Sequence, residues 1–312
     1  MGYADEGITI KYLGKEYDVT KFKKFHPGGS NTLTAFKGLD ITKQFIETEH
    51  SPAAYSLLKE YDVKEETEED LVDWSKSLYK QVGQLGKNYH SWVLNPVDKK
   101  ARLFDSDLLE QLTITQWYVV PIFWVPIILG LTYSAHLQIG RVAENEGTYV
   151  LNLLGSFLFG FFLWPLFEYA AHRWIFHLKP PDDWPFLISL HFGLHGLHHK
   201  VPFDERRLLF PPAPAAVIAF IVYCVYSVIF PAWAVPAIGA GSLTGYVMYD
   251  LIHYYLHYGS PKEGTYFYFM KRYHNQHHFV HHNQGFGISN NFWDKIFSTG
   301  LTLKKLKFNM KW

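Results

Sequence analysis

The sequence predicts a mainly α-helical integral membrane protein with a small α+β head in front of its membrane domain. Four apolar stretches in the second part of the chain each approach the roughly 20 residues that a helix needs to cross the hydrocarbon core. Four groups of histidines stand at the ends of these stretches or in the segments just after them. We therefore expect four transmembrane helices, arranged as two hairpins, with a histidine-rich cap on one side of the membrane.

The head is predicted in residues 1–65, which are mixed in character and carry strand-like runs (ITIKYL, EYDVT) among short polar helices. Residues 66–110 are expected to be a linker with an amphipathic segment, because apolar residues at helical spacing follow the acidic run KEETEED. That helix would lie either on the bilayer surface or on the next domain, and both interpretations remain open. Its apolar positions are Leu71, Trp74, Leu78, Val82 and Leu85.

The membrane domain is predicted in residues 111–312. Its apolar stretches lie at about 114–136, 149–171, 213–235 and 236–257. The first two are joined by the short segment RVAENEGTY, and the last two are separated only around Pro231 and Pro236. Each pair is therefore expected to return to the side that it left. A re-entrant course, which dips into the membrane without crossing it, remains an alternative for the last stretch.

Charged residues predict the orientation of these helices. Lysines and arginines gather on the side to which both hairpins return, whereas Arg141 stands alone on the other side. By the positive-inside rule, the head, the segment 172–212 and the basic tail are then cytosolic, with both termini in the cytosol. The N-terminus lacks the apolar core of a signal peptide, so insertion is expected to rely on internal segments. The basic residues ahead of the tail are Lys99, Lys100, Arg102, Lys200, Arg206, Arg207, Lys271 and Arg272.

The composition restricts the partners. Lys and Arg number 29 against 29 Asp and Glu, and this balance argues against a nucleic acid, which attracts a basic excess. Phe, Trp and Tyr make up 18% of the residues, as expected for helices whose ends lie in membrane interfaces, so membrane lipid is the expected surrounding. The one cysteine, Cys224, excludes an intrachain disulfide and is expected to be a packed or lipid-facing residue.

The histidine groups have the spacing of metal ligands. Neutral imidazole suits iron, zinc, copper and nickel, and separations of three or four residues place side chains on one face of a helix. His172 and His177 are five residues apart, so they need a helix end or a bend between them. Ten such groups exceed the needs of one ion, and we expect two metal ions in one nitrogen-rich cage. The expected ligands are His172, His177, His195, His198, His199, His253, His257, His274, His277 and His278.

Two carboxylates stand close to these ligands in the sequence. Glu168 precedes His172 by four residues, and Asp250 precedes His253 by three. Each is expected to accept the second ring N–H of a ligand and so to fix its orientation. Carboxylates are otherwise nearly absent from the groups, unlike the Glu-x-x-His repeats of di-iron bundles. The weaker candidates for ligands, outer groups or proton carriers are His191, His281 and His282.

The head carries a second histidine motif. Residues 17–29, which end in HPGG, and the later Glu49-His50-Ser51 resemble the haem-binding core of cytochrome b5, over roughly residues 8–63. The resemblance implies a haem b with His26 and His50 as axial ligands. Such a haem has no open iron position, so it carries electrons and does not bind oxygen. The stretch before Gly7 is too short for the first strand and helix of that family, so an N-terminally trimmed head is expected.

From about residue 89 to residue 297 the chain resembles the fatty acid 2-hydroxylases, and the ten histidines match that family's histidine boxes in order and spacing. Fusion to a cytochrome b5-like head is typical of the same family. The motifs that carry the resemblance are Trp92-Val93, Pro96-Val97, Arg102-Leu103-Phe104, Glu168 to His177, His191 to His199, Arg207 to Pro212, Gly245 to His257, Gly285 to Ser289 and Trp293-Asp294.

The resemblance implies an endoplasmic-reticulum membrane enzyme that makes 2-hydroxy acyl chains for sphingolipids, from a free fatty acid or a ceramide. Oxygen insertion at a C–H bond uses O₂ with two electrons and two protons, so two iron ions are the expected cofactors, with zinc as the alternative in a purified sample. The electrons would come through the haem from an NAD(P)H-dependent donor of the cytochrome b5 reductase type. The acyl chain would lie between the helices, with its polar end oriented by Tyr255, Tyr258, Tyr273 and Asn275.

Other functions remain as alternatives. A membrane desaturase with a fused cytochrome b5 also carries histidine boxes, but its last box usually begins with Gln, whereas here it begins with His274. Sterol and carotenoid hydroxylases usually lack the head. A non-enzymatic metal carrier would place histidines along a path through the bilayer, and the one-sided distribution disfavours it. A tail-anchored electron carrier would need one anchor helix rather than four.

Overall fold

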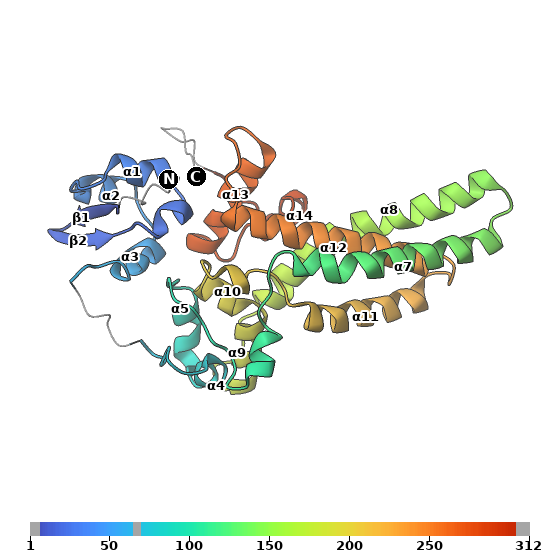
Figure 1. The fold of residues 1–312 in the computed structure, drawn as a ribbon, viewed down its shortest axis with the longest axis horizontal. Helices are drawn as coiled ribbons and strands as arrows, with labels where there is room; N and C mark the ends of the chain where they lie inside the picture. Colours follow the sequence, from blue (N-terminus) through green and yellow to red (C-terminus); the bar gives the residue numbers. More distant parts are fainter. Residues whose placement is uncertain (1–6, 65–69, 304–312) are drawn as a thin grey trace, which may run out of the picture.

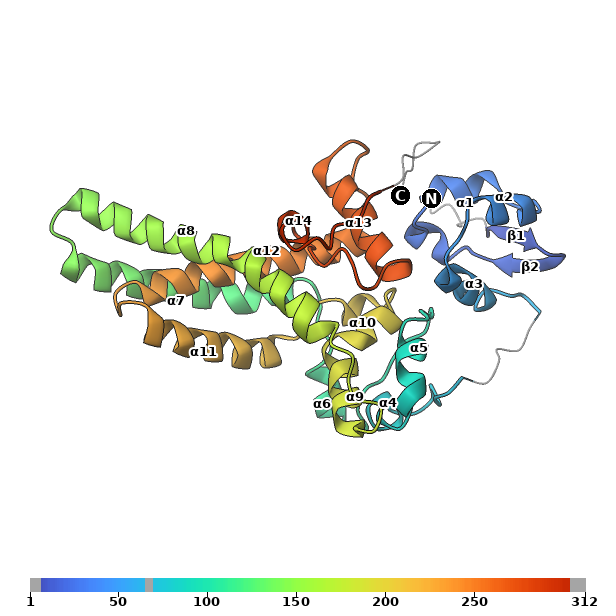
Figure 2. The same ribbon diagram turned by 180° about the vertical axis from the view of Figure 1, so that it is seen from behind.

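The structure, a computed structural model, describes residues 7–64 and 70–303. The head lies at one end of the molecule and the long helices at the other, with shorter helices between them (Figures 1 and 2). In chain order the described elements are β1 (Thr9–Tyr12), β2 (Lys15–Asp18), η1 (Phe22–Phe25), α1 (Ser30–Ala35), α2 (Thr42–Glu47), α3 (Pro52–Lys59), α4 (Leu78–Gly83), η2 (Gly86–Asn88), α5 (Tyr89–Val93), α6 (Asp107–Gln111), α7 (Val119–Val142), α8 (Glu146–Ala171), η3 (His172–Phe176), α9 (Pro185–His191), η4 (Phe192–Gly196), α10 (Leu197–Lys200), η5 (Glu205–Arg207), α11 (Pro212–Ile229), α12 (Val235–Tyr258), α13 (Tyr266–Phe279) and α14 (Phe292–Ile296).

The head is a small α+β unit, as predicted. β1 and β2 pair in antiparallel register, with Ile10 opposite Tyr17. Leu13 and Gly14 in the turn between them both have positive φ, the backbone geometry that matches the twist of a tight hairpin. Ile10 and Val19 are buried in a core that α1, α2 and α3 help to enclose. The expected trimming concerns the start of the chain, and residues 1–6 lie outside the described residues.

The segment after the head is part of the cap on the membrane helices and does not behave as a linker. Its apolar residues form one buried cluster with α9 and η4, in which Leu78 and Val82 are fully enclosed. Leu71 is 57% exposed, and α4 begins only at Leu78. The prediction of a single amphipathic helix from Leu71 onward is therefore wrong. Of the two locations considered for these apolar residues, the structure places them against the next domain. The acidic run falls largely on residues 65–69, and the basic tail on residues 304–312, all outside the described residues.

Three helices of the described chain are long and apolar enough to cross a membrane, namely Val119–Val142, Glu146–Phe176 and Glu205–Ile229. They correspond to the first three apolar stretches. α12 has 24 residues, but its glycines, hydroxyls, Asp250 and histidines keep it out of that set. It packs against α7, α8 and α11 and is buried along most of its length. A helix enclosed by other helices needs small residues for close packing more than it needs apolar ones. That α12 crosses the membrane as a fourth span stays a prediction.

Glycines let α8 and α12 approach closely. A Cβ on Gly160 would collide with the carbonyl oxygen of Ile238, and a Cβ on Gly241 would collide with that of Phe157. Between these contacts, the Ser242 hydroxyl donates to the carbonyl of Gly160 at 3.1 Å. Small residues at a crossing allow backbones to come into direct contact. This crossing fixes the C-terminal half of α12, which carries His253 and His257, relative to the end of α8.

We expect the substitution Gly241→Ala to push α8 and α12 apart and to destabilise the protein by about 2 kcal/mol, in the range of overpacked cores. Thermal unfolding of the detergent-solubilised protein, followed by circular dichroism, measures this loss as a lower midpoint. Gly155→Ala on α8 is the matched control, because nothing lies within 4 Å of the added Cβ. It should retain or slightly raise the midpoint through its higher helix propensity. Equal midpoints for the two variants would contradict the close crossing.

Candidate dimetal site

His172 and His177 are brought together by a π-helical turn. Helix α8 continues into η3, where the backbone N–H of His177 donates to the carbonyl of His172 at 3.1 Å. A bond between residues five apart adds one residue to the helical turn, so both side chains point the same way. Their Nε2 atoms lie 3.2 Å apart. The sequence predicted a bend or a helix end between these two histidines. In the structure, the extra residue of the π-helical turn aligns them.

Five histidines from three segments of the chain form the first group. Their ligand atoms all lie within 4.8 Å of one another. Neighbouring Nε2 atoms are 3.2 Å apart between His172 and His195, 3.0 Å between His195 and His199, and 3.0 Å between His177 and His277. The members of this group are His172, His177, His195, His199 and His277.

The other five predicted ligands form a second group with the same dimensions. Nε2 atoms lie 2.9 Å apart between His198 and His278, 3.1 Å between His198 and His253, and 2.9 Å between His257 and His274. The members are His198, His253, His257, His274 and His278. The two groups touch, because the rings of His199 and His278 stack with centroids 4.3 Å apart. Consecutive histidines such as His198 and His199 therefore serve different groups.

This geometry fits two metal ions. Imidazole nitrogens bound at 2.0–2.1 Å to one ion lie about 3 Å from their nearest neighbours when the ligand angles are close to 90°. Burial lowers the pKa of His198, His199 and His277 well below its ordinary value, and neighbouring histidines lower it further. These rings are therefore neutral at pH 7, the form in which imidazole binds a metal. All ten predicted ligands are thus placed to hold two ions in adjacent five-nitrogen cages.

The weaker ligand candidates lie outside both groups. His191 accepts or donates a hydrogen bond at 2.5 Å between its Nδ1 and the hydroxyl of Tyr89. His281 is exposed. The ring of His282 lies edge-on to His199 at 5.9 Å, which makes it a neighbour of the first group and not a member.

A loop after α13 orients two of the ligands. The Nδ1 atom of His172 donates to the carbonyl of Phe286 at 2.5 Å, and that of His277 donates to the carbonyl of Gln284 at 2.8 Å. A proton held on Nδ1 leaves Nε2 as the ligating atom, and such outer hydrogen bonds fix the ring. This loop is one of the motifs of the family resemblance, but its role as an acceptor of ring protons could not be read from the sequence.

Glu168 holds this loop and does not contact a ring, so its predicted role was wrong. Its carboxylate accepts from the backbone N–H groups of Ile288 and Ser289, both at 2.7 Å, and from the hydroxyl of Ser289. The buried Asp294 accepts from the N–H groups of Phe286 at 3.0 Å and Gly287 at 2.8 Å. Two carboxylates thus hold the backbone of the loop, and this backbone in turn orients the ligands. The loop folds back against the end of α8, and helical spacing in the sequence does not reveal that contact.

Asp250 also has different partners from those expected. It accepts from the backbone N–H of Phe210 at 3.4 Å and from the hydroxyl of Tyr246 at 3.3 Å. It therefore joins α12 to the segment just before α11, instead of accepting a ring N–H of His253.

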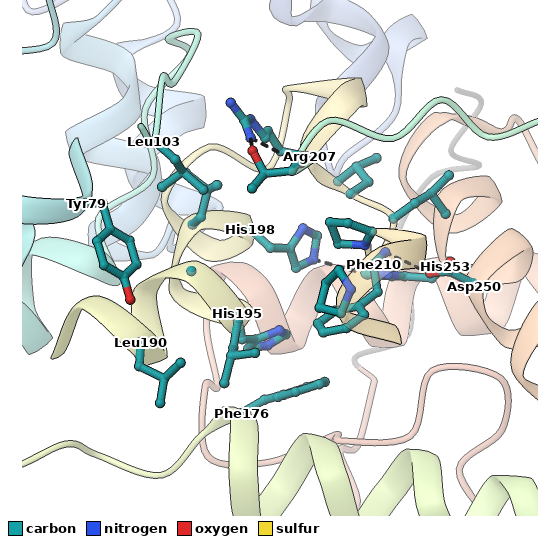
Figure 3. Close-up of a pocket in the computed structure, with 18 of the residues that line it drawn as sticks. Tyr79, Leu103, Phe176, Leu190, His195, His198, Arg207, Phe210, Asp250 and His253 are labelled. Carbon is teal, nitrogen blue, oxygen red and sulfur yellow. Dashed lines mark hydrogen bonds between the residues drawn. The ribbon is translucent and has the colours of Figure 1, made fainter. Parts of the chain in front are cut away.

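A cavity of about 230 Å³ borders both histidine groups. His195 of the first group and His198 and His253 of the second reach its wall, and Asp250 lies beside His253 (Figure 3). The rest of the wall is mostly apolar, from Phe176, Leu190, Leu194, Leu197, Leu208, Leu209, Phe210, Pro211 and Pro214. An apolar space that ends on two candidate metal positions suits an alkyl chain.

The four residues predicted to orient the substrate do not line this cavity. Tyr255 is exposed and packs against Phe267, while the hydroxyl of Tyr258 donates to the carbonyl of Phe203 at 2.5 Å. The hydroxyl of Tyr273 accepts from the backbone N–H of Leu301 at 3.2 Å. Asn275 is buried on α13 away from the cavity wall. A role of these four residues in orienting the polar end of a substrate stays a prediction.

In the head, His26 and His50 face each other. Their ring centroids are 6.5 Å apart and the ring planes differ by 27°. Two imidazoles on opposite sides of one ion have centroids roughly 6 Å apart, so the pair fits a haem iron. Nδ1 of His26 donates to the carbonyl of Gly29 at 3.1 Å, and that of His50 to the carbonyl of Phe45 at 2.9 Å. Burial lowers the pKa of His26 to about 4 and also lowers that of His50, so both rings are neutral.

The glycine after His-Pro has a steric role. A Cβ on Gly28 would lie 2.7 Å from Cε1 of His26, so a larger residue would displace this ring. Gly29 has a φ of +86°, which side-chain-bearing residues rarely adopt. The two glycines of the HPGG motif therefore permit the observed position of the His26 ring, which larger residues would disturb.

Comparisons with known proteins match both parts of the chain. A family model described as fatty acid hydroxylase matches residues 157–299, and one for the cytochrome b5-like haem/steroid binding domain matches residues 4–65. The fatty acid 2-hydroxylase of Homo sapiens is 40% identical, over 91% of this chain and 88% of its own length. The chain belongs to the fatty acid 2-hydroxylase family. It is therefore a hydroxylase with a cytochrome b5 domain at its N-terminal end.

Further relatives extend across kingdoms. The dihydroceramide fatty acyl 2-hydroxylase FAH1 of Arabidopsis thaliana is 38% identical, over 75% of this chain and 94% of its own length. A solved structure of full-length scs7p, in which only the hydroxylase domain is visible, is 31% identical with a TM-score of 0.64, covering 74% of this chain and 86% of that one. The hydroxylase fold of this family is thus the fold found here.

We expect Asp294→Ala to weaken metal binding about ten- to hundred-fold, the usual cost of losing a partner behind the ligands. The side chain is 0% exposed, and its loss leaves the N–H groups of Phe286 and Gly287 without acceptors, which releases the loop that orients His172. Metal content after dialysis against graded chelator measures the change. Asp183→Ala, at an exposed position, is the control and should bind metal like the parent protein. If Asp294→Ala retained metal like the parent protein, the hydrogen bonds that Asp294 accepts from the loop would have no effect on metal binding by the ligands.

Proposed function

We propose that the protein hydroxylates C2 of a long fatty acyl chain, free or as the N-acyl group of a ceramide, for sphingolipid synthesis. The observation that carries this proposal is the meeting of two five-histidine groups at the end of one apolar cavity. The names of the relatives support the same reaction, since they include fatty acid 2-hydroxylases and a dihydroceramide fatty acyl 2-hydroxylase. The volume of the cavity is below the 300–1,000 Å³ typical of ligand pockets. It would therefore hold the carboxyl end of the chain, with the remainder extending out between the helices.

The reaction R–CH₂–COX + O₂ + 2e⁻ + 2H⁺ → R–CHOH–COX + H₂O balances in atoms and electrons. Two iron ions held by the ten histidines would supply the oxygen activation, which requires a redox-active metal. Phe176, Leu209 and Phe210 would bind the acyl chain and exclude water from its C–H bonds. The carbonyls of Gln284 and Phe286 would keep the protons of His277 and His172 on Nδ1, so that these rings remain neutral ligands.

The head would supply electrons one at a time through a haem b held by His26 and His50, from an NAD(P)H-dependent reductase of the cytochrome b5 reductase type. Domain boundaries at about residues 65 and 110 would separate the head, the segment after it and the membrane hydroxylase domain. α12 would cross the membrane as a fourth helix shielded by its neighbours. The protein would reside in the endoplasmic-reticulum membrane with both termini in the cytosol, on the same side as the histidine cap.

The purified protein, incubated with a reductase, NADPH, O₂ and a long-chain fatty acid or ceramide, should yield the 2-hydroxy product, identified by mass spectrometry. His277→Ala removes one ligand nitrogen of the first group and should abolish turnover while retaining the haem absorption band. An unsaturated product would instead support a desaturase. Full activity of His277→Ala would overturn the role of the five-histidine groups.

His26→Ala should remove the haem absorption band and stop turnover that the reductase drives, because one axial ligand is lost. Absorption spectroscopy and the same product assay measure both effects. His136→Ala is a suitable control, since His136 lies on α7 with its Nδ1 at 2.6 Å from the hydroxyl of Tyr149 and outside every histidine group. Reductase-driven turnover that persists without the haem band would refute the electron relay.

A further inference from the structure

We propose that the head docks on the hydroxylase domain through an aromatic contact built from residues next to ligands on both sides, and that this docked arrangement delivers electrons to the second histidine group. The inference rests on the proposed function and adds to it the surface at which the two domains work. In the solved relative only the hydroxylase domain is visible.

The rings at this contact belong to residues that are direct sequence neighbours of candidate ligands in the head and in the second histidine group. Phe25 directly precedes His26, and its ring lies 4.9 Å from that of Phe203. The same ring stands edge-on to Tyr258 at 5.2 Å, and Tyr258 directly follows His257. Both separations lie within the 4.5–7 Å at which aromatic rings attract one another. Each side of the interface is therefore one residue away from a candidate ligand.

A series of ring contacts continues through the interface to the second group. Phe22 lies 5.8 Å from the ring of His26 and 5.6 Å from that of Phe203, edge-on in both cases. Phe203 in turn stacks on Phe279 at 6.1 Å, with an interplanar angle of 11°. Phe279 directly follows His278, and their rings are 5.9 Å apart. The rate of electron transfer falls steeply with distance, and this series connects the two sites through packed rings.

Polar contacts at the end of the head fix its orientation. The hydroxyl of Tyr61 donates to Asp98 at 3.0 Å, and Lys99 pairs with Glu60 at 3.7 Å. The ammonium of Lys24 lies 5.6 Å from the centre of the Tyr258 ring, a cation–π contact across the interface. Figure 1 shows the head beside the end of the molecule that carries α10 and α13, and η1 of the head contacts α12. Apolar rings in the centre with polar pairs around them are the usual composition of a specific interface.

The electron balance of the docked arrangement is simple. Each transfer would oxidise a haem iron held by His26 and His50 from Fe(II) to Fe(III) and would reduce a metal ion held by the second histidine group by one electron, after which the reductase would reduce the haem again. Two transfers supply the two electrons of one hydroxylation, while its two protons come from water. The role of Phe22, Phe25, Phe203 and Phe279 is to hold the two sites close, without chemical change of their own.

The test uses the full-length protein and two independent measurements. Carbodiimide cross-linking converts close carboxylate–amine pairs into amides, so peptide mapping should find Glu60 joined to Lys99. Phe203→Ala removes the central ring and should lower the docking equilibrium constant about ten-fold, as expected for losing one half-buried aromatic side chain. The yield of this cross-link should fall accordingly, while that of Lys80 with Asp105, which lie 3.9 Å apart in the segment after the head, should not change. In stopped-flow absorption, substrate-dependent oxidation of the prereduced haem by O₂ with a long-chain fatty acid should slow in parallel.

Phe25→Ala provides a second variant on the head side, in case Phe203→Ala fails to fold, since Phe25 lies outside the buried core of the head. Phe186→Ala, at an exposed position on α9, is the matched control and should behave like the parent protein. Unchanged cross-linking and unchanged haem oxidation in both interface variants would overturn the proposal. Reduced cross-linking with normal haem oxidation would also overturn it, because the contact would then not deliver electrons. Failure of the hydroxylation reaction itself would appear as absent product in the parent protein, whatever the cross-link yield.

Discussion

The close approach of ten imidazole rings, nitrogen to nitrogen, governs the architecture around the two histidine groups. Within each group of five, neighbouring Nε2 atoms lie about 3 Å apart, and lone pairs at that distance repel unless a cation binds between them. Burial keeps the rings neutral and removes the alternative of solvation by water. The surrounding protein must therefore hold rings from η3 and its C-terminal end, η4, α10, α12 and α13 in a geometry that they would not adopt by themselves.

Three devices provide that rigidity. A π-helical turn at the end of α8 adds the residue that aligns His172 with His177. The glycine-rich crossing of α8 and α12 sets the height of His253 relative to η3. Glu168 and Asp294 clamp the loop whose carbonyls orient two ligands. The two carboxylates act on the backbone behind the ligands, and so the coordination sphere itself can consist entirely of nitrogen.

The substrate cavity and the head reach the histidine groups through different residues. The cavity ends on His195, His198 and His253, whereas the aromatic contact with the head leads to His257 and His278. Neither Phe203 nor Tyr258 lines the cavity. In the proposed reaction, separate approaches would let an acyl chain stay bound during two successive electron transfers. This distribution also speaks against a metal carrier, since the described histidines of the two groups converge on one place instead of following a path across the membrane.

The ten histidines of the two groups could be named from the amino-acid sequence, because side chains three or four residues apart share one face of a helix. The candidate spans of α7, α8 and α11 could likewise be predicted from their apolar length. How the ten histidines divide, with His198 and His199 in different groups, could be seen only in the folded chain. The tertiary structure also shows that Glu168 holds a loop, that Leu78 and Val82 pack in the cap, and that Phe176 and Phe210 line the cavity while Tyr255 does not. The physical reason is common to these cases. They depend on contacts between segments far apart in the chain and on one extra residue in a helical turn, and neither leaves a local period in the sequence.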